Sequence, residues 1–206
     1  MKKAIGVVLL CALVASGCVS TGATLHPAPP PLVARCDATQ AQLSVEADQR
    51  ASPWGIEKHV ARNFPGRQVS WLMKDSAYQT FVVQTNAKNF GRCNDTGCYL
   101  FAAPTTVIQR AVQESMKDGK HDPEMLGKAL GLPAKNFEGT LRMMTLDLEA
   151  TGVCVRLPVE SDPGVWKCTT PEETDCFKFG GYTSGGVPEV MVLNAPVAQA
   201  RVEEVP

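Results

Sequence analysis

The stretch "TLRMMTLDLE" (140–149) carries a two-residue alternation that decides how this chain is expected to fold. Leu141, Met143 and Thr145 recur at every second position and would lie on one face, opposite Arg142 and Met144. That period is typical of a β-strand with one face in a core. Further strand-like runs follow as "VCVRLP", "CFKFG" and "EVMVLN".

Helical spacing precedes these strands. One helix is predicted behind Thr105 and Thr106, and a second behind Asp122 and Pro123, which provide a cap and a first-turn residue. Two shorter helices are expected before Phe64, the first with Asp37 as its N-cap. The apolar residues of the clearest helix are Val107, Ile108, Ala111, Val112 and Met116.

Between these helices, "RQVSWLMK" and "YQTFVVQT" have the composition of two strands and predict a hairpin. Trp71, Phe81 and Val83 would then be core residues. The order of strands, helices and strands predicts an α+β fold, a single domain with a mainly antiparallel sheet and several helices.

The first residues, "MKKAIGVVLLCALVASGC", have the parts of a secretory signal: Lys2 and Lys3, an apolar run, and small residues before a cleavage point. The apolar run has 12 residues, from Ala4 to Ala15, which is too short to span a bilayer. This predicts a signal peptide over residues 1–17. Such a segment can be an ordinary secretory signal, in which Cys18 has no special role, or the signal of a lipidated protein.

Ala15, Ser16 and Gly17 before Cys18 resemble the lipobox of bacterial lipoproteins, which usually carries Leu where this chain has Ala15. The resemblance implies cleavage before Cys18 and acylation of its thiol and its new amino group, including palmitate. Several acyl chains would anchor the protein stably in a lipid bilayer. Because Val19 and not Asp follows Cys18, the implied address is the periplasmic face of the outer membrane.

Composition limits the remainder of the chain. Removing residues 1–17 leaves 206 − 17 = 189 residues with 18 basic and 21 acidic side chains, a formal charge of −3. No basic cluster is present to follow a phosphate backbone, so no nucleic-acid partner is expected. The Pro-rich segment 18–35 is predicted to be a tether, residues 36–197 the folded domain, and residues 198–206 an acidic, solvated tail.

Cysteines agree with an oxidising compartment. Six remain beyond Cys18, an even number that predicts three disulfides. Only the turn-rich "CNDTGC" suggests a local pair, and six cysteines otherwise allow 15 connectivities. No metal site is expected, because the Cys-x4-Cys spacing has no second pair. The disulfide candidates are Cys36, Cys93, Cys98, Cys154, Cys168 and Cys176.

The glycine-rich run "GGYTSGGVPE" (180–189) allows two interpretations. Its four glycines supply turns, with Glu189 solvated at the entrance to a strand. Alternatively, the glycines let a ligand approach the backbone, and Glu189 stabilises an oxocarbenium charge or binds a sugar hydroxyl. The first interpretation is favoured, because no partner of Glu189 can be assigned from the sequence.

Residues 180–194 are locally similar to the last part of bacterial ADP-ribosyltransferase-type domains, whose catalytic Glu opens a late strand. That similarity implies Glu189 as the catalytic carboxylate, Tyr182 stacking on a ring, Ser184 or Thr183 at a ribose, and NAD as the cofactor. A basic residue such as Arg156 or His59 would have to converge on the site. The family usually has Gln or Glu where this chain has Val187.

Two functions are therefore expected. The first is a membrane-anchored periplasmic lipoprotein that binds a partner protein or an envelope component, with no cofactor. The second is an NAD-using enzyme centred on Glu189. The sequence favours the first, because no serine-hydrolase elbow, His-Glu-x-x-His motif or P-loop occurs.

Overall fold

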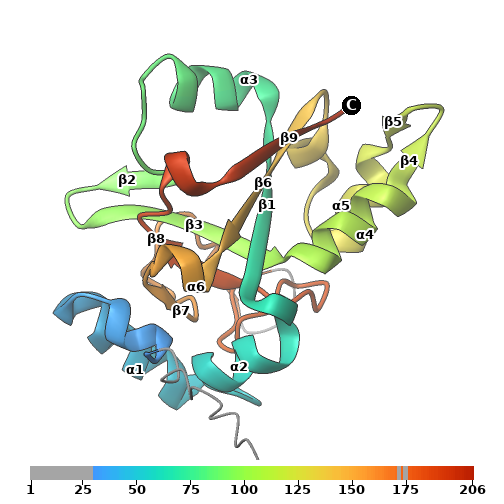
Figure 1. Ribbon diagram of the computed structural model, residues 1–206. Coiled ribbons are helices and arrows are strands. Elements are labelled where there is room, and N and C mark those ends of the chain that lie inside the picture. Colours follow the sequence, from blue (N-terminus) through green and yellow to red (C-terminus); the bar gives the residue numbers. More distant parts are fainter. Residues whose placement is uncertain (1–29, 171–172, 174–175) are drawn as a thin grey trace, which may run out of the picture.

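A computed structural model describes residues 30–170, 173 and 176–206, and its centre is one antiparallel sheet (Figure 1). The strands lie in the order β7-β8-β3-β1-β6-β9. Strand β2 pairs with the first residues of β3, to which a tight turn joins it. All the pairings in this sheet are antiparallel. The strands are β1 (Gln68–Lys74), β2 (Arg92–Asn94), β3 (Gly97–Pro104), β6 (Leu141–Asp147), β7 (Val155–Arg156), β8 (Val190–Leu193) and β9 (Arg201–Val205).

The helices form two groups. Helices α1 (Ala38–Arg50) and α2 (Ile56–Asn63) lie at one end of the sheet, and α4 (Thr105–Ser115) and α5 (Pro123–Leu130) lie beside it (Figure 1). The shorter elements are η1 (Leu32–Arg35), η2 (Pro65–Arg67), α3 (Asp75–Tyr78), the π-helix η3 (Gln79–Val83), the β4–β5 hairpin (Met116–Lys117 and Lys120–His121), η4 (Ala134–Phe137), α6 (Leu148–Thr151) and η5 (Val197–Gln199).

The predicted capping residues are found at helices α1 and α5. Asp37 accepts a hydrogen bond from the Gln40 amide at the start of α1, and Asp122 does the same for α5. Gly131 ends α5 in a left-handed conformation, which glycine adopts without steric cost. These helices and the antiparallel sheet together confirm the predicted α+β fold.

Strand β1 divides two cores. Val69 and Trp71 belong to the larger core, which α1 and α2 cover, while Leu72 packs against the smaller core beneath α4 and α5. Between them Ser70 is fully buried, and its hydroxyl contacts those of Thr105 and Thr145 at 3.0 and 2.8 Å. The buried polar group is therefore satisfied.

Three disulfides join all six expected cysteines, and the local Cys93–Cys98 pair is confirmed. Cys168–Cys176 is also local, whereas Cys36–Cys154 joins residues 118 positions apart. A cross-link over a long loop restricts the unfolded chain most. By chain entropy the long bridge contributes about 5 kcal/mol, against about 2 kcal/mol for the Cys93–Cys98 pair.

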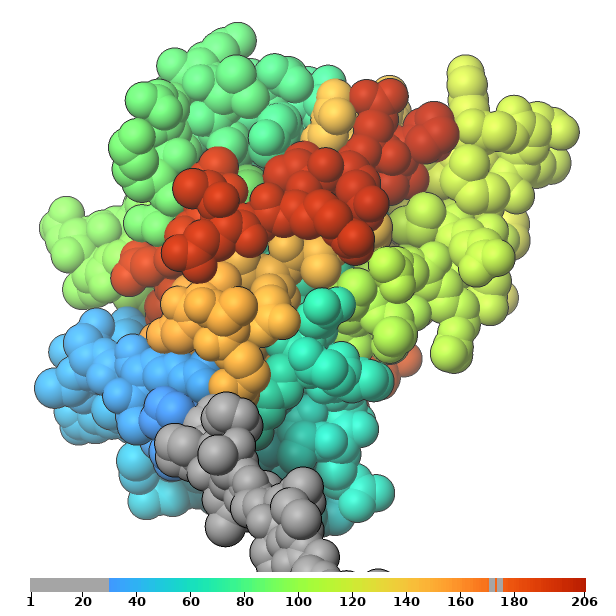
Figure 2. Space-filling model, in the orientation of Figure 1, coloured from blue at the N-terminus to red at the C-terminus, as the bar shows by residue number. Residues whose placement is uncertain are grey.

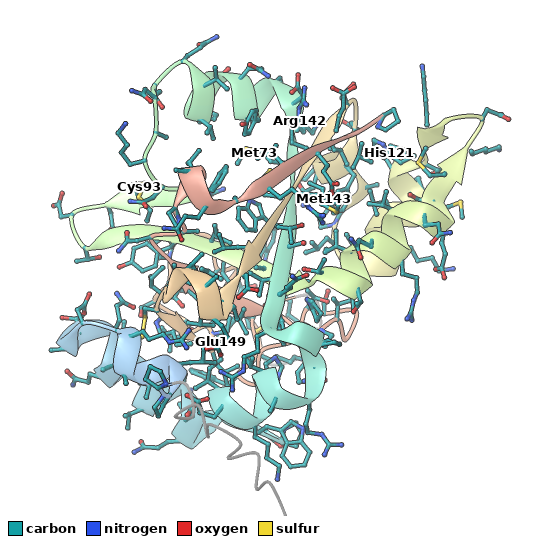
Figure 3. The ribbon with its side chains drawn as sticks, viewed as in Figure 1. Met73, Cys93, His121, Arg142, Met143 and Glu149 are labelled. Carbon is teal, nitrogen blue, oxygen red and sulfur yellow. A yellow bond between two sulfur atoms is a disulfide. The ribbon has the colours of Figure 1, made fainter. Side chains whose placement is uncertain are left out.

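Two ion-pair clusters connect distant segments, and both central residues are labelled in Figure 3. Glu149 binds Arg35 and Arg67, which ties α6 to η1 and η2. Burial alone would raise the pKa of Glu149, but the two guanidinium groups hold it below its usual value. Arg142 of β6 binds Asp75 at 2.6 Å and Glu204 at 2.9 Å, which ties α3 to β9.

The predicted hairpin is wrong. Residues 75–83 continue from β1 as the helices α3 and η3, and Phe81 and Val83 are 67% and 51% exposed instead of buried in a core. Both edges of β1 are already paired, one with β3 and one with β6. The β3 pairing covers only Val69 and Ser70. After Lys74 the chain leaves the sheet as a helix, so the strand-forming side chains at 81–83 form no second strand.

The expected acidic tail is also different. Residues 201–205 form the edge strand β9, in register with β6. Val205 is buried and Val202 packs on the larger core, while Glu203 and Glu204 remain exposed. Charged residues on an edge strand are common, because they discourage further pairing.

The predicted signal peptide, Cys18 and residues 19–29 of the predicted tether lie outside the described residues. Within the described part of the chain, no helix has the length and apolar character needed to cross a membrane.

Candidate functional site

A small cavity of about 110 Å³ lies between the sheet, helices α4 and α5, and the loop that precedes β8. Its lining is mainly apolar, and Glu189 is the one ionisable residue among the lining residues that the structure describes. The other lining residues include Ser70, Leu72, Phe101, Ala103, Ile108, Leu130, Leu132, Phe137, Thr183 and Val187.

Strand alternation directs Glu189 into this cavity. Val190, the first residue of β8, pairs with Ala102 and belongs to the larger core. Glu189 precedes it and therefore faces the opposite side of the sheet, next to Phe101 and Ala103. The side chain is half-buried. Burial raises the pKa of Glu189 to about 7 from its ordinary 4.5, and no neighbouring charge or hydrogen bond among the described residues offsets that rise.

The hydroxyl groups of the loop have a structural role. Thr183 Oγ1 donates to the carbonyl of Leu130 at 3.2 Å, and Ser184 Oγ donates to that of Gly131 at 3.2 Å. These carbonyls are at the C-terminus of α5, where no further helical turn can satisfy them. The loop thus closes the cavity by capping α5.

Close backbone contact explains two of the glycines. A Cβ atom on Gly131 would lie 2.5 Å from the Cα of Gly185, and one on Gly185 would lie 2.5 Å from the Cα of Gly131. Any side chain at either position would force the loop away from α5. Gly185 of the glycine-rich run is therefore required for packing the loop against the end of α5.

Tyr182 lies with residues of α2 and not in the cavity. Its ring meets that of His59 edge-to-face at 5.1 Å between centroids, and its hydroxyl accepts from Asn63 Nδ2 at 3.3 Å. Asn63 Nδ2 is also 3.2 Å from His59 Nδ1. His59 is fully buried, and its Nε2 has no hydrogen-bond partner among the described residues. Burial lowers the pKa of His59 despite the nearby carbonyl of Glu189.

Arg156 is committed elsewhere. It is fully buried, contacts both carboxylate oxygens of Asp162, and donates to Gln40 at 2.9 Å. It does not line the cavity that contains Glu189. The structure therefore does not bring Glu189, Tyr182, Ser184 and a basic residue together in one pocket.

The arrangement can hold a proton on Glu189 and admit little more than a small apolar group, since ligand pockets usually have ≈ 300–1,000 Å³. Sequence reasoning missed the apolar lining, which comes from six separate segments, and the role of Asn63. The four-residue spacing of His59 and Asn63 on one helix was the available signal for that pair. Among the described residues no group of three His, Cys, Asp or Glu side chains could hold a metal ion.

Comparisons with protein families, curated proteins and solved structures find no match for this chain.

Glu189→Gln is expected to change how stability depends on pH. A carboxyl group whose pKa is raised on folding stabilises the fold fully below its unfolded pKa of about 4.5 and loses that contribution as pH rises through about 7. The loss is at most about 3 kcal/mol, and less because solvent screens the exposed part of the half-buried carboxyl. Urea unfolding should show the variant equal to the native chain near pH 4.5 and more stable at pH 8. A constant difference between the two proteins at every pH would contradict the buried carboxyl.

Proposed function

We propose that this chain is a lipid-anchored module on the periplasmic face of the outer membrane that binds a partner protein. The proposal combines a compartment, an anchor and a binding surface. The observation that carries the binding role is the exposure of Phe81, an aromatic side chain that the fold leaves largely in solvent at the end of β1.

The compartment is supported by the cysteines. All six beyond Cys18 are in disulfides, and each pair lies within the described residues. Stable disulfides form in oxidising compartments such as the bacterial periplasm and are rare in the cytosol. The anchor rests on the sequence alone, on the lipobox-like residues that precede Cys18.

The binding surface is the Phe81 surface, defined as the exposed side chains of Phe81 and Val83 on either side of the buried Val82. Its helix η3 is a single π-turn, a form that often occurs at functional sites. Figure 2 shows this green segment at the opposite end of the molecule from α1 and α2. The surface is thus remote from the start of the described chain.

An exposed phenylalanine provides binding energy that folding has not used. Burying such a side chain is worth about 1.5–3 kcal/mol. Polar residues lie at the start of the same helical segment, where Asp75, Gln79 and Arg142 form a hydrogen-bonded set. Aromatic side chains are enriched in protein-binding interfaces.

Trp166 is as exposed as Phe81 but differs from it in two respects. Its indole N–H donates to Glu173 at 3.0 Å, and its loop contains residues outside the described part of the chain. Phe81 belongs to a continuously described helix and is the better-defined anchor.

The NAD-using enzyme is less well supported. Stabilising an oxocarbenium charge requires the ionised carboxylate, whereas burial keeps about half of the Glu189 population protonated near neutral pH. No basic side chain lines the cavity among the described residues. We therefore do not propose NAD as a cofactor.

Replacing Cys18 by Ser tests the anchor. Without the acceptor thiol, acylation cannot occur, so the variant should accumulate unprocessed or leave the outer-membrane fraction. Mass spectrometry of the native protein should show a mature chain that starts at residue 18 and carries the mass of its acyl chains. A Cys18→Ser protein of normal mature size that still needs detergent for extraction would contradict the proposal.

A photo-crosslinking residue in place of Phe81 tests the binding surface. In intact cells it should yield a discrete adduct with one protein, because the side chain at position 81 would be in direct contact with that partner. The same residue in place of Val45, which is 53% exposed on α1, is the matched control. Equal adducts from positions 45 and 81, or none from position 81, would contradict a specific surface there. Phe81→Asp should meanwhile leave the melting temperature nearly unchanged, since the side chain has little packing to lose.

A further inference from the structure

Helix α2 presents a surface of cations around one indole. Lys58 Nζ lies 3.9 Å from the centroid of the Trp54 ring, and Arg62 Cζ lies 4.9 Å from it. Both cations are exposed and are four residues apart, so they share one side of the helix. We call Trp54, Lys58 and Arg62 the α2 surface.

The acidic residues nearest in sequence are engaged with other groups. Glu57 accepts a hydrogen bond from the amide of Leu32, and Asp48 accepts from the amide of Ile56 and thereby caps α2. Neither Lys58 nor Arg62 forms a salt bridge with an acidic residue in the described part of the chain. Their charges are therefore available to an anionic partner.

A second cation–aromatic pair lies on the neighbouring helix. The Arg50 guanidinium is 3.6 Å from the centroid of the Phe179 ring, and Arg50 is only weakly paired with Glu46, at 3.6 Å. Lys178, next to Phe179, is exposed as well. Arg50 and Lys178 thus add exposed cations to those of the α2 surface, although the chain as a whole is acidic.

The described chain also begins at this end. Leu32 contacts the first turn of α2 through Glu57, and Figure 1 places the start of the coloured ribbon beside α1 and α2. Pro30 follows Cys18 by 30 − 18 = 12 residue steps. A chain of that length spans at most about 40 Å when fully extended. The α2 surface is therefore within reach of the bilayer that would hold an acylated Cys18.

We propose that the α2 surface docks on the anionic phospholipid headgroups of that bilayer. This inference rests on the proposed lipid anchor. Lysine and arginine are attracted to an anionic leaflet, and tryptophan prefers the interface between headgroups and acyl chains. Two or three cations bind weakly on their own, but a short tether keeps the effective lipid concentration high. Docking would turn the Phe81 surface away from the membrane.

The test uses the mature, acylated protein reconstituted into vesicles of phosphatidylethanolamine with or without phosphatidylglycerol. Trp166→Phe leaves Trp54 and the buried Trp71, and headgroup-labelled quencher lipids then report contact of Trp54 with the surface. Quenching should require phosphatidylglycerol and should disappear in 0.5 M salt, in which the Debye length is only a few ångströms, roughly 4 Å. Lys58→Gln with Arg62→Gln should lower the ratio of docked to free protein roughly 30-fold.

The matched control removes the same charge from another exposed site, with Lys117→Gln and Lys120→Gln in the β4–β5 hairpin. This control should be quenched as the native chain is. Equal quenching in both double variants, or quenching without phosphatidylglycerol, would overturn the inference. The inference would also be overturned if the Lys58→Gln, Arg62→Gln variant kept its lipid contact but lost a cross-link to a protein, because the α2 surface would then bind protein.

Vesicle flotation separates this inference from the anchor on which it rests. Protein that floats without lipid quenching of Trp54 contradicts the docking alone. Protein that does not float contradicts the anchor, and quenching on added anionic vesicles then decides whether the α2 surface still binds headgroups.

Discussion

The register of β1 on β6 is the constraint on which the rest of the structure depends. Seven consecutive pairs, from Gln68↔Asp147 to Lys74↔Leu141, fix which side chains of both strands enter each core. A slip of one residue would move Trp71 and Leu72 to the wrong faces. The hydroxyl contacts of Ser70 with Thr105 and Thr145 oppose such a slip, because the slip would break them and leave buried polar groups without partners.

The same strand separates the two surfaces to which functions are proposed. Helix α2 and η2 precede β1, and α3 and η3 follow it, so the α2 surface and the Phe81 surface lie at its two ends (Figure 1). Seven residues of strand correspond to about 23 Å. The cavity at Glu189 lies beside this axis, on the face covered by α4 and α5, and its loop is held by the C-terminus of α5.

Much of the fold was predictable because its signals are local. Asp37, Asp122 and Gly131 are caps whose chemistry acts within a few residues, and the Cys93–Cys98 turn closes on itself. The failures involve long-range competition. Residues 81–83 have strand-forming side chains, but β1 pairs with the distant strands β3 and β6, and the chain that follows β1 is helical. At the candidate site, Glu189 and the glycines were identified, whereas only the fold shows that Tyr182 faces His59 and that Arg156 is bound by Asp162.

We infer that β1 holds one end of the domain at the membrane and the other end away from it. Energy transfer from a fluorophore to acceptors in the bilayer measures this directly in proteoliposomes. The fluorophore would be attached without cysteine chemistry at Ala61 of α2 or at Thr80 of η3, both of which are exposed. Position 80 is expected to lie farther from the bilayer than position 61 by about 20 Å, which is one strand length. Equal distances, or a shorter distance for position 80, would contradict it.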